Sequence, residues 1–213
     1  RFPRDSAARY AAEPDFAEWG HRLEIFGLDL RHTPSVEDLC HHLVTTRDRL
    51  DFVVNNACQT VRRPPAFYRH MMELERTSLG ALPEHVRALL GGVDGRRGPE
   101  LLEAPGDLLA ATGAVTSAAE LSQAALLPEE HEAQGHLFPD GRLDQELQQV
   151  DLRGRNSWRL TLAEVSSVEL LETQLVNAVA PFVLNARLKP LMLRTPERDK
   201  HIVNVSAVEG QFY

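Results

Sequence analysis

The run LDFVVNNAC, residues 50–58, decides the fold class of this chain. Its valine-rich centre is short and apolar, and it stops abruptly at the amide pair Asn55 and Asn56. A second run of the same form, IVNVSAVEG, occupies residues 202–210. Each pattern is typical of a buried parallel strand. Because ligands of open α/β sheets bind outside the carboxyl ends of the strands, the two runs indicate where a site would lie.

The residues before the first run favour a parallel α/β arrangement. LEIFGLDL, residues 23–30, is predicted to be a strand. TPSVED, from residue 33, has the hydroxyl cap, early proline and acids of a helix start, and this helix is predicted to run to about residue 49. Strand, helix and strand in this order form a right-handed βαβ unit. Residues 5–19 are helix-prone, with a break at Pro14.

Residues 62–155 interrupt this regularity because they are rich in glycine, proline, alanine and acids. Only short helical segments are predicted there, at 66–75, 84–90 and 118–126. The pattern favours a surface insertion, and a lid or partner-binding arm is the alternative. The chain is therefore divided into a first part of an α/β domain at 1–61, an insertion at 62–155 and a second part at 156–213.

A long helix is predicted before the second run. Asn177 lies within it, off the centre of its apolar stripe, and Pro181 should kink it just beyond Asn177. The stripe recurs at the spacing of three and four residues that marks one helix face, and it consists of Val168, Leu171, Leu175, Val179 and Phe182.

Composition narrows the class of protein. The 213 residues, 43% of them hydrophobic, suffice for one α/β domain with a core. The net charge of −8 argues against nucleic acid or an anionic membrane surface as a partner. No apolar run has the length of a membrane span.

The cysteines and histidines bear on the compartment and on metal binding. Cys40 and Cys58 fit a reducing compartment, so we expect a cytoplasmic protein. His131 and His136 are five residues apart, on different helix faces, and predict no metal site.

Taken in order, these motifs resemble the short-chain dehydrogenase/reductase family over residues 1–60 and 162–210. NNAC at 55–58 is similar to the family's Asn-Asn-Ala-Gly, and LDL at 28–30 to the segment after its third strand. LVNA at 175–178 resembles the helix that carries the family's relay asparagine, and 202–210 resembles its fifth strand. The resemblance implies a Rossmann-like, doubly wound parallel sheet, incomplete at both ends, with a mostly helical or irregular insertion.

The resemblance also implies an oxidoreductase that transfers a hydride between NADP(H) and a small-molecule carbonyl or alcohol. NAD(H) is the second choice of cofactor, and a homo-oligomer fits the family. Asn177 matches a catalytic position, and Ser206, one residue before the position of the family's catalytic serine, is the second catalytic candidate. The acid that meets the adenine amino group is Asp29, and Arg1 and Arg4 stand where basic residues favour a 2′-phosphate. The full set of matched cofactor positions is Arg1, Arg4, Asp29, Leu30, Asn55, Asn56 and Ala57.

Each of these assignments has a structural alternative. Asn55 would then be a strand-end amide that ties two loops, and Asp29 a turn acid that caps the next segment. Asn177 would be a helix amide satisfied by a carbonyl. Arg1 and Arg4 would be ordinary surface residues.

The chain also departs from the family pattern. Cys58 replaces a glycine that lies close to the cofactor, and Ala207 replaces the carbonyl-polarising serine. The family's glycine-rich phosphate turn and its Tyr-x-x-x-Lys pair are not found in the sequence, and Tyr213 follows the strand too soon to be that tyrosine. We therefore expect these 213 residues alone to lack dehydrogenase activity. The alternative function, favoured by Ala207, is a dinucleotide-binding or scaffold protein without catalysis.

Overall fold

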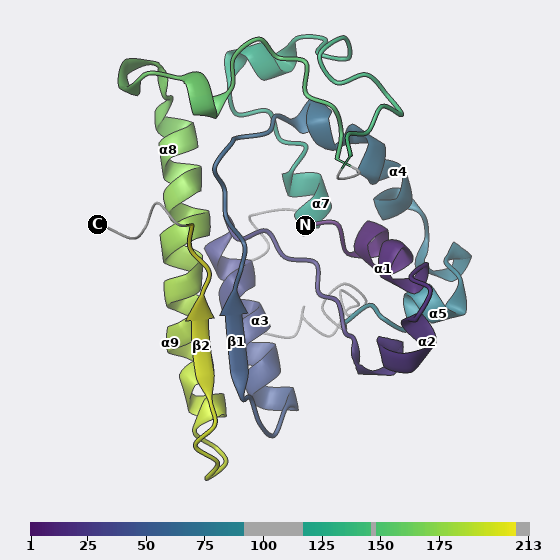
Figure 1. Cartoon of the computed structure of the whole chain (residues 1–213), viewed down its shortest axis with the longest axis vertical. Helices are drawn as coiled ribbons and strands as arrows, with labels where there is room; N and C mark the ends of the chain where they lie inside the picture. Colours follow the sequence, from purple (N-terminus) through teal and green to yellow (C-terminus); the bar gives the residue numbers. More distant parts are fainter. Residues whose placement is uncertain (92–116, 146–147, 208–213) are drawn as a thin grey trace, which may run out of the picture. The chain divides into compact units, whose positions relative to one another are not determined.

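The computed structural model describes residues 1–91, 117–145 and 148–207 (Figure 1). The chain divides into two compact units. The first comprises Arg1–Asp29 and Arg63–Arg153, and the second comprises Leu30–Arg62 and Gly154–Tyr213. The limits of the second unit lie close to the predicted boundaries after residues 61 and 155. Residues 1–29, however, pack with the segment that was predicted to be an insertion.

The first unit is built from short helices. Those predicted around the break at Pro14 and at 66–75 are confirmed. Those predicted at 84–90 and 118–126 are present but shorter, because they end at Arg87 and Leu121. The α-helices among the described residues of this unit are α1 (Pro3–Ala11), α2 (Phe16–Trp19), α4 (Arg69–Arg76), α5 (Glu84–Arg87) and α7 (Ala118–Leu121). Short 3-10 helices occur at Gly20–Arg22, Pro65–Tyr68, Leu79–Ala81 and Pro128–His131.

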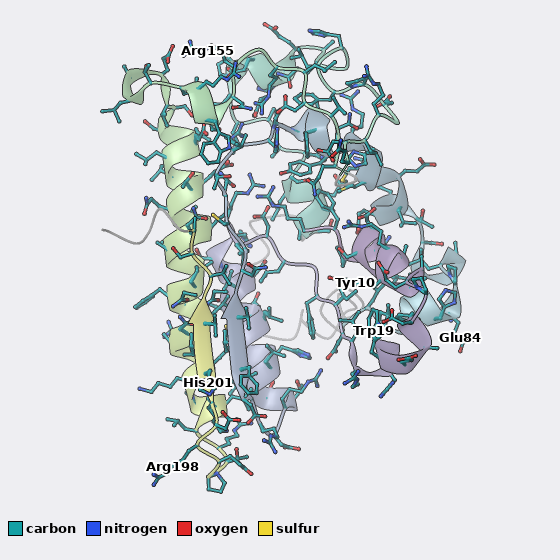
Figure 2. The ribbon with its side chains drawn as sticks, viewed as in Figure 1. Tyr10, Trp19, Glu84, Arg155, Arg198 and His201 are labelled. Carbon is teal, nitrogen blue, oxygen red and sulfur yellow. The ribbon has the colours of Figure 1, made fainter. Side chains whose placement is uncertain are left out.

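Aromatic side chains fix the turn between α1 and α2. Tyr10 and Trp19 meet edge to face with ring centroids 6.1 Å apart, as Figure 2 shows. Phe16 packs against Trp19 in the same manner at 5.3 Å. Such edge-to-face pairs add to the stabilisation gained from burial alone. The helix-prone segment is therefore folded back on itself around Trp19.

The prediction of a strand at 23–30 is wrong. Among these residues, all of them described, only Ile25 makes a β-bridge, and its partner is Leu90. The Ile25 N–H donates to the Leu89 carbonyl at 2.7 Å, and the Gly91 N–H donates to the Ile25 carbonyl at 2.7 Å. Leu23 and Ile25 pack against a buried cluster that contains Ala7 and Leu89. The apolar alternation covers helices of the first unit and does not extend a sheet.

The second unit is a small α/β structure. Its elements are α3 (Thr33–Thr46), β1 (Phe52–Asn55), α8 (Ser167–Gln174), a π-helical turn (Leu175–Val179), α9 (Ala180–Met192) and β2 (His201–Asn204). Two 3-10 turns at Ser157–Arg159 and Leu162–Glu164 precede α8. In the described part of the chain, the sheet consists of β1 and β2 alone.

The two strands pair in parallel, as predicted. The register matches Phe52 with His201 and Asn55 with Asn204. The bounds of β1 agree with the prediction, whereas β2 ends two residues before the predicted limit at 206. Pairing continues one step further, because the Val205 N–H donates to the Asn55 carbonyl at 3.0 Å.

One face of this sheet is covered and the other is open. Figure 1 shows α3 and α9 on the same side of the strands, and α3 packs on α9. Val53 and Asn55 are half-buried, whereas Phe52 and Val54 are 55% and 60% exposed. The Phe52 ring stacks on the imidazole of His201, with centroids 5.6 Å apart, at the start of the strand pair (Figure 2). Burial thus alternates along β1, as the period of a strand requires. All four residues of β2 are exposed, so the expectation of a buried strand is wrong for the second run.

The long helix is confirmed, with a widened turn at its centre. Ser166 caps its start by accepting the Glu169 N–H at 3.1 Å. Pro181 has no N–H to donate to the carbonyl four residues earlier, that of Asn177, and the π turn lies just before Pro181. The structure therefore has a π-helical turn at Leu175–Val179, where the sequence predicted a kink just beyond Asn177.

The apolar stripe that indicates this helix does not face the interior of the second unit. Leu171 and Phe182 are 61% and 72% exposed. The buried positions lie on another face, and they are Glu172, Val176, Ala180, Val183, Leu188, Leu191 and Met192. No helix among the described residues is both long and apolar enough to cross a membrane.

Candidate site at the carboxyl ends of the paired strands

Both strands of the second unit end in asparagine, and the two amides meet. The Asn55 Nδ2 donates to the Asn204 Oδ1 at 2.8 Å and to the Asn185 Oδ1 of α9 at 3.0 Å. One side-chain amide thus ties the ends of β1 and β2 to the helix beneath them. This geometry matches the alternative in which Asn55 is a structural strand-end amide, and a cofactor contact by Asn55 stays a prediction.

The segment after β1 is held by the long helix. The Asn177 Oδ1 accepts the Gln59 N–H at 2.8 Å, and its Nδ2 donates to the Gln59 carbonyl at 3.0 Å. Asn177 lies in the π turn, which brings its amide level with this backbone. The structure therefore joins two predicted features, the helix asparagine and the segment that follows Asn55.

A buried carboxylate holds the same segment further along. Glu172 of α8 is 5% exposed, and its two oxygens accept from two arginines. The Arg62 Nε lies 2.9 Å from one oxygen, and the Arg31 Nη1 lies 2.6 Å from the other. A carboxylate removed from water requires such partners, since an unpaired buried charge is costly. Glu172 therefore connects α8 to the segment before α3, which contains Arg31, and to the segment after β1, which contains Arg62.

The sequence analysis did not identify this cluster. Glu172, Gln59, Arg31 and Arg62 carry no motif. The sequence contains one indication of this cluster, which is that Glu172 lies within an apolar helix segment. A buried acid needs an oppositely charged or hydrogen-bonding partner. That signal does not name the partners, which lie more than a hundred residues away in the chain.

The residues that follow the two strands are exposed, and most of them have small side chains. Asn56, Ala57 and Cys58 are exposed after β1, and Ser206 is exposed after β2. The Ser206 Oγ donates to the carbonyl of Ala207 at 3.4 Å. The small side chain of Ala57 allows a flat ligand to approach closely, and the amide of the neighbouring Asn56 can hydrogen bond the polar edges of such a ligand.

The remaining predicted residues lie mainly in the first unit. Asp29 is 1% exposed and pairs with Arg1, whose Nε is 3.4 Å from the carboxylate. Arg1 also lies over the Tyr68 ring, 5.5 Å from its centroid. Arg4 donates through Nη1 to the carbonyls of Glu75 and Thr77. The predicted positions are thus divided between the units, Arg1, Arg4 and Asp29 in the first and Leu30, Asn55, Asn56, Ala57, Asn177 and Ser206 in the second.

In the described residues, no group of three or more His, Cys, Asp or Glu side chains is placed to hold a metal ion.

Comparisons of the chain with protein-family models, with curated proteins and with solved structures give no match. The chemistry of the site is therefore inferred from its own residues.

Proposed function

We propose that the carboxyl ends of β1 and β2 form the floor of a dinucleotide site in a short-chain-type oxidoreductase. The observation that carries this proposal is the parallel pairing of two strands that both end in asparagine, with Asn177 fixing the segment after the first. In doubly wound sheets, ligands bind beyond such strand ends. We also propose that these two strands are part of a doubly wound sheet.

The second unit provides groups that fit a nucleotide. The exposed Ala57 allows close approach of a flat ring system, and Asn56 supplies donors and an acceptor. Asn177 is a positioning residue, because both polar groups of its amide bond the backbone of Gln59. Ser206, exposed after β2, is the candidate for polarising a substrate carbonyl. When bound, the nicotinamide would supply or accept the hydride.

The two arginines proposed to recognise a 2′-phosphate both have partners within the first unit. Arg4 is engaged with the carbonyls of Glu75 and Thr77, which leaves it poorly suited to hold a phosphate. Arg1 pairs with Asp29 through Nε at 3.4 Å and lies over the Tyr68 ring. Preference for NADP(H) over NAD(H) is therefore proposed from the resemblance of the sequence to the family.

A second candidate function is dinucleotide binding without catalysis. Ala207 favours it, because an alanine cannot donate a hydrogen bond to a substrate carbonyl. The exposed position of Ser206 favours the oxidoreductase. The two candidates share a binding site and differ in turnover.

Calorimetric titration with NADP⁺ and NAD⁺ tests the shared site. We expect NADP⁺ to bind about ten- to a hundredfold more tightly than NAD⁺, the ratio that one charge-assisted contact provides. Ala57→Tyr should weaken both affinities at least about tenfold, because the ring fills the approach to β1. Ala163→Tyr, at another exposed alanine, is the matched control and should leave them unchanged.

Absence of heat for both cofactors at concentrations of about 1 mM would contradict a dinucleotide site. Equal affinities would contradict the preference for NADP(H) and would leave the shared site in place. Binding combined with hydride transfer to a panel of carbonyl compounds supports the oxidoreductase. Binding without transfer by the 213 residues alone is expected for both candidates, because the Tyr-x-x-x-Lys pair is not among these residues. Binding without transfer by a chain that carries this pair would support the second candidate.

A further inference from the structure

A hollow of about 230 Å³ lies at the end of α2 in the first unit, and it is lined by Trp19, Arg22 and Leu23. Trp19 is the last residue of α2, Arg22 ends the 3-10 turn that follows, and Leu23 begins the extended segment after it. One short stretch of chain thus brings an indole, a guanidinium and an aliphatic side chain together. None of the three residues belongs to the dinucleotide site proposed above.

The aromatic wall of this hollow is held in place from behind. Tyr10 and Phe16 both meet the Trp19 ring edge to face, with centroids 6.1 and 5.3 Å away (Figure 2). The Phe16 ring occupies the space beside Gly20, where an added Cβ would come within 2.5 Å of it. A larger residue at position 20 would therefore displace Phe16 from Trp19. A wall that is already fixed in this way lowers the entropic cost of binding a ligand.

The aliphatic side of the hollow is fixed as well. Leu23 is half-buried and packs against the buried cluster that contains Ala7 and Leu89. An indole and a leucine side chain together favour a ligand with a flat apolar body, because such a body covers both of them and stacks on the ring.

Arg22 supplies the polar part of the hollow. Its side chain is exposed, and within the described ranges its guanidinium has no hydrogen bond and no ion pair. Other exposed arginines of the chain do pair with acids, as Arg49 pairs with Asp51 at 2.9 Å. The described residues that line the hollow include no acid, so a ligand would not compete with one for Arg22 there. A guanidinium binds a carboxylate through two parallel N–H groups, which a neutral amide cannot match.

We propose that this hollow binds a small aromatic carboxylate, with its ring against Trp19 and Leu23 and its carboxylate on Arg22. Pockets for drug-sized molecules have volumes of roughly 300–1,000 Å³, so a volume of about 230 Å³ suits a compound with a single ring. The proposal does not depend on the dinucleotide site, and each stands if the other fails.

NMR of the full chain with benzoate as the probe tests the site. The chain has two tryptophans, and Trp158 lies in the second unit with 74% of its side chain exposed. The two indole N–H resonances are assigned with a Trp158→Phe variant. Benzoate should shift the Trp19 resonance with a dissociation constant of about 0.1–1 mM, since a single ring makes few contacts. The Trp158 resonance is the internal reference and should not move.

Two further probes separate the parts of the ligand. Benzamide keeps the ring and lacks the charge, and acetate keeps the charge and lacks the ring. Each should bind at least about tenfold more weakly than benzoate. Arg22→Gln should weaken benzoate binding about tenfold or more, and it should leave the fold intact because Arg22 is exposed. Arg142→Gln, at an exposed arginine of the same unit that does not line the hollow, is the matched control and should leave the affinity unchanged.

Several results would overturn the proposal. A Trp19 resonance that does not move up to about 10 mM benzoate would exclude the site. Equal shifts of both indole resonances would show that benzoate associates with any exposed tryptophan. Benzamide binding as tightly as benzoate, or Arg22→Gln binding benzoate as tightly as Arg142→Gln, would exclude recognition of a carboxylate by Arg22. Acetate binding as tightly as benzoate would exclude recognition of the ring.

Discussion

Asn177 holds the backbone of Gln59 from both sides, since its Oδ1 accepts the Gln59 N–H at 2.8 Å and its Nδ2 donates to the Gln59 carbonyl at 3.0 Å. A single amide side chain thus satisfies both polar groups of a peptide position after β1. A primary amide is suited to this task because it carries a donor and an acceptor side by side. A carboxylate or an aliphatic side chain of similar size lacks one or both groups.

Asn177→Asp should loosen the segment after β1. The substitution keeps an acceptor for the Gln59 N–H, but it replaces the donor with an oxygen that repels the Gln59 carbonyl. A net hydrogen bond contributes about 0.5–1.5 kcal/mol, so amide hydrogen exchange at residues 57–60 should accelerate up to about tenfold.

Asn185→Asp is the matched control for this prediction. Asn185 uses its Oδ1 to accept from Asn55, and an aspartate retains that acceptor. Exchange at residues 57–60 should therefore stay close to that of the wild type. Equal acceleration by the two variants would contradict a specific role of Asn177.

Glu172→Gln should destabilise the second unit. The substitution leaves Arg31 and Arg62, which are 17% and 7% exposed, without the opposite charge between them. Removal of one partner of a buried ion pair costs roughly 3–5 kcal/mol. Urea unfolding should show this loss of free energy for Glu172→Gln. Glu169→Gln, the same change on the same helix, should cost less than about 1 kcal/mol from the helix dipole. Similar losses for the two variants would contradict the importance of the cluster.

The two cysteines should react at different rates. Burial, with a further contribution from the charge of Glu37, raises the pKa of Cys40 to about 11, and its side chain is 1% exposed. Cys58 is exposed. Because the thiolate is the reactive form, an Ellman titration at about pH 8 should show one fast thiol in the native protein and two after unfolding. Cys58→Ser should abolish the fast phase. A fast phase that survives this substitution would show that Cys40 becomes accessible.

The turn before α8 should weaken in acid. Hydrogen bonds from Arg155, at 2.6 and 2.7 Å, and from the N–H and hydroxyl of Thr161 lower the pKa of Glu164 to about 2 (Figure 2 labels Arg155). A carboxyl whose folded pKa is depressed stabilises the fold above its unfolded pKa, near 4.3, and loses this contribution as the pH falls towards 2.

Carboxyl NMR measures this titration directly. The Glu164 resonance should titrate near pH 2 in the wild type, and Arg155→Gln should move the midpoint upwards towards 4.3. A midpoint near 4.3 in the wild type would contradict the pairing with Arg155.

The elements around β1 can be predicted from the residues that form them. A valine run bounded by polar residues predicts β1 with its observed bounds, and the early proline predicts the start of α3. The predicted hydroxyl cap is wrong, because the N-cap residue is His32 and its side chain makes no capping hydrogen bond. The pairing of β1 with β2 is also predictable, because two apolar runs separated by a helix pair in parallel in a βαβ unit.

The remaining features depend on residues distant in the chain. The alternation of Leu23 and Ile25 suits a strand and also suits an extended segment lying on helices, and contacts with Ala7 and Leu89 decide between them. The exposed side of the long helix has the same periodicity as a buried one, so the pattern alone does not say which side faces inwards. The partners of Glu172 follow from the folded path of the chain and from no local motif.

The pairing of Asn55 with Asn204 has a consequence for the order in which the chain folds during its synthesis. Residues 56–200 separate the two strands, and a ribosome that adds 5–20 residues per second needs roughly 7–30 s to make them. During that time β1 is present with α3 but without its only described strand partner, so one row of its backbone N–H and C=O groups is unpaired, and Phe52 and Val54 add apolar surface on its open face. Long-range closure of this kind is slow even after release. The interval before β2 emerges is thus the period in which the nascent chain is most exposed to aggregation and most in need of a chaperone.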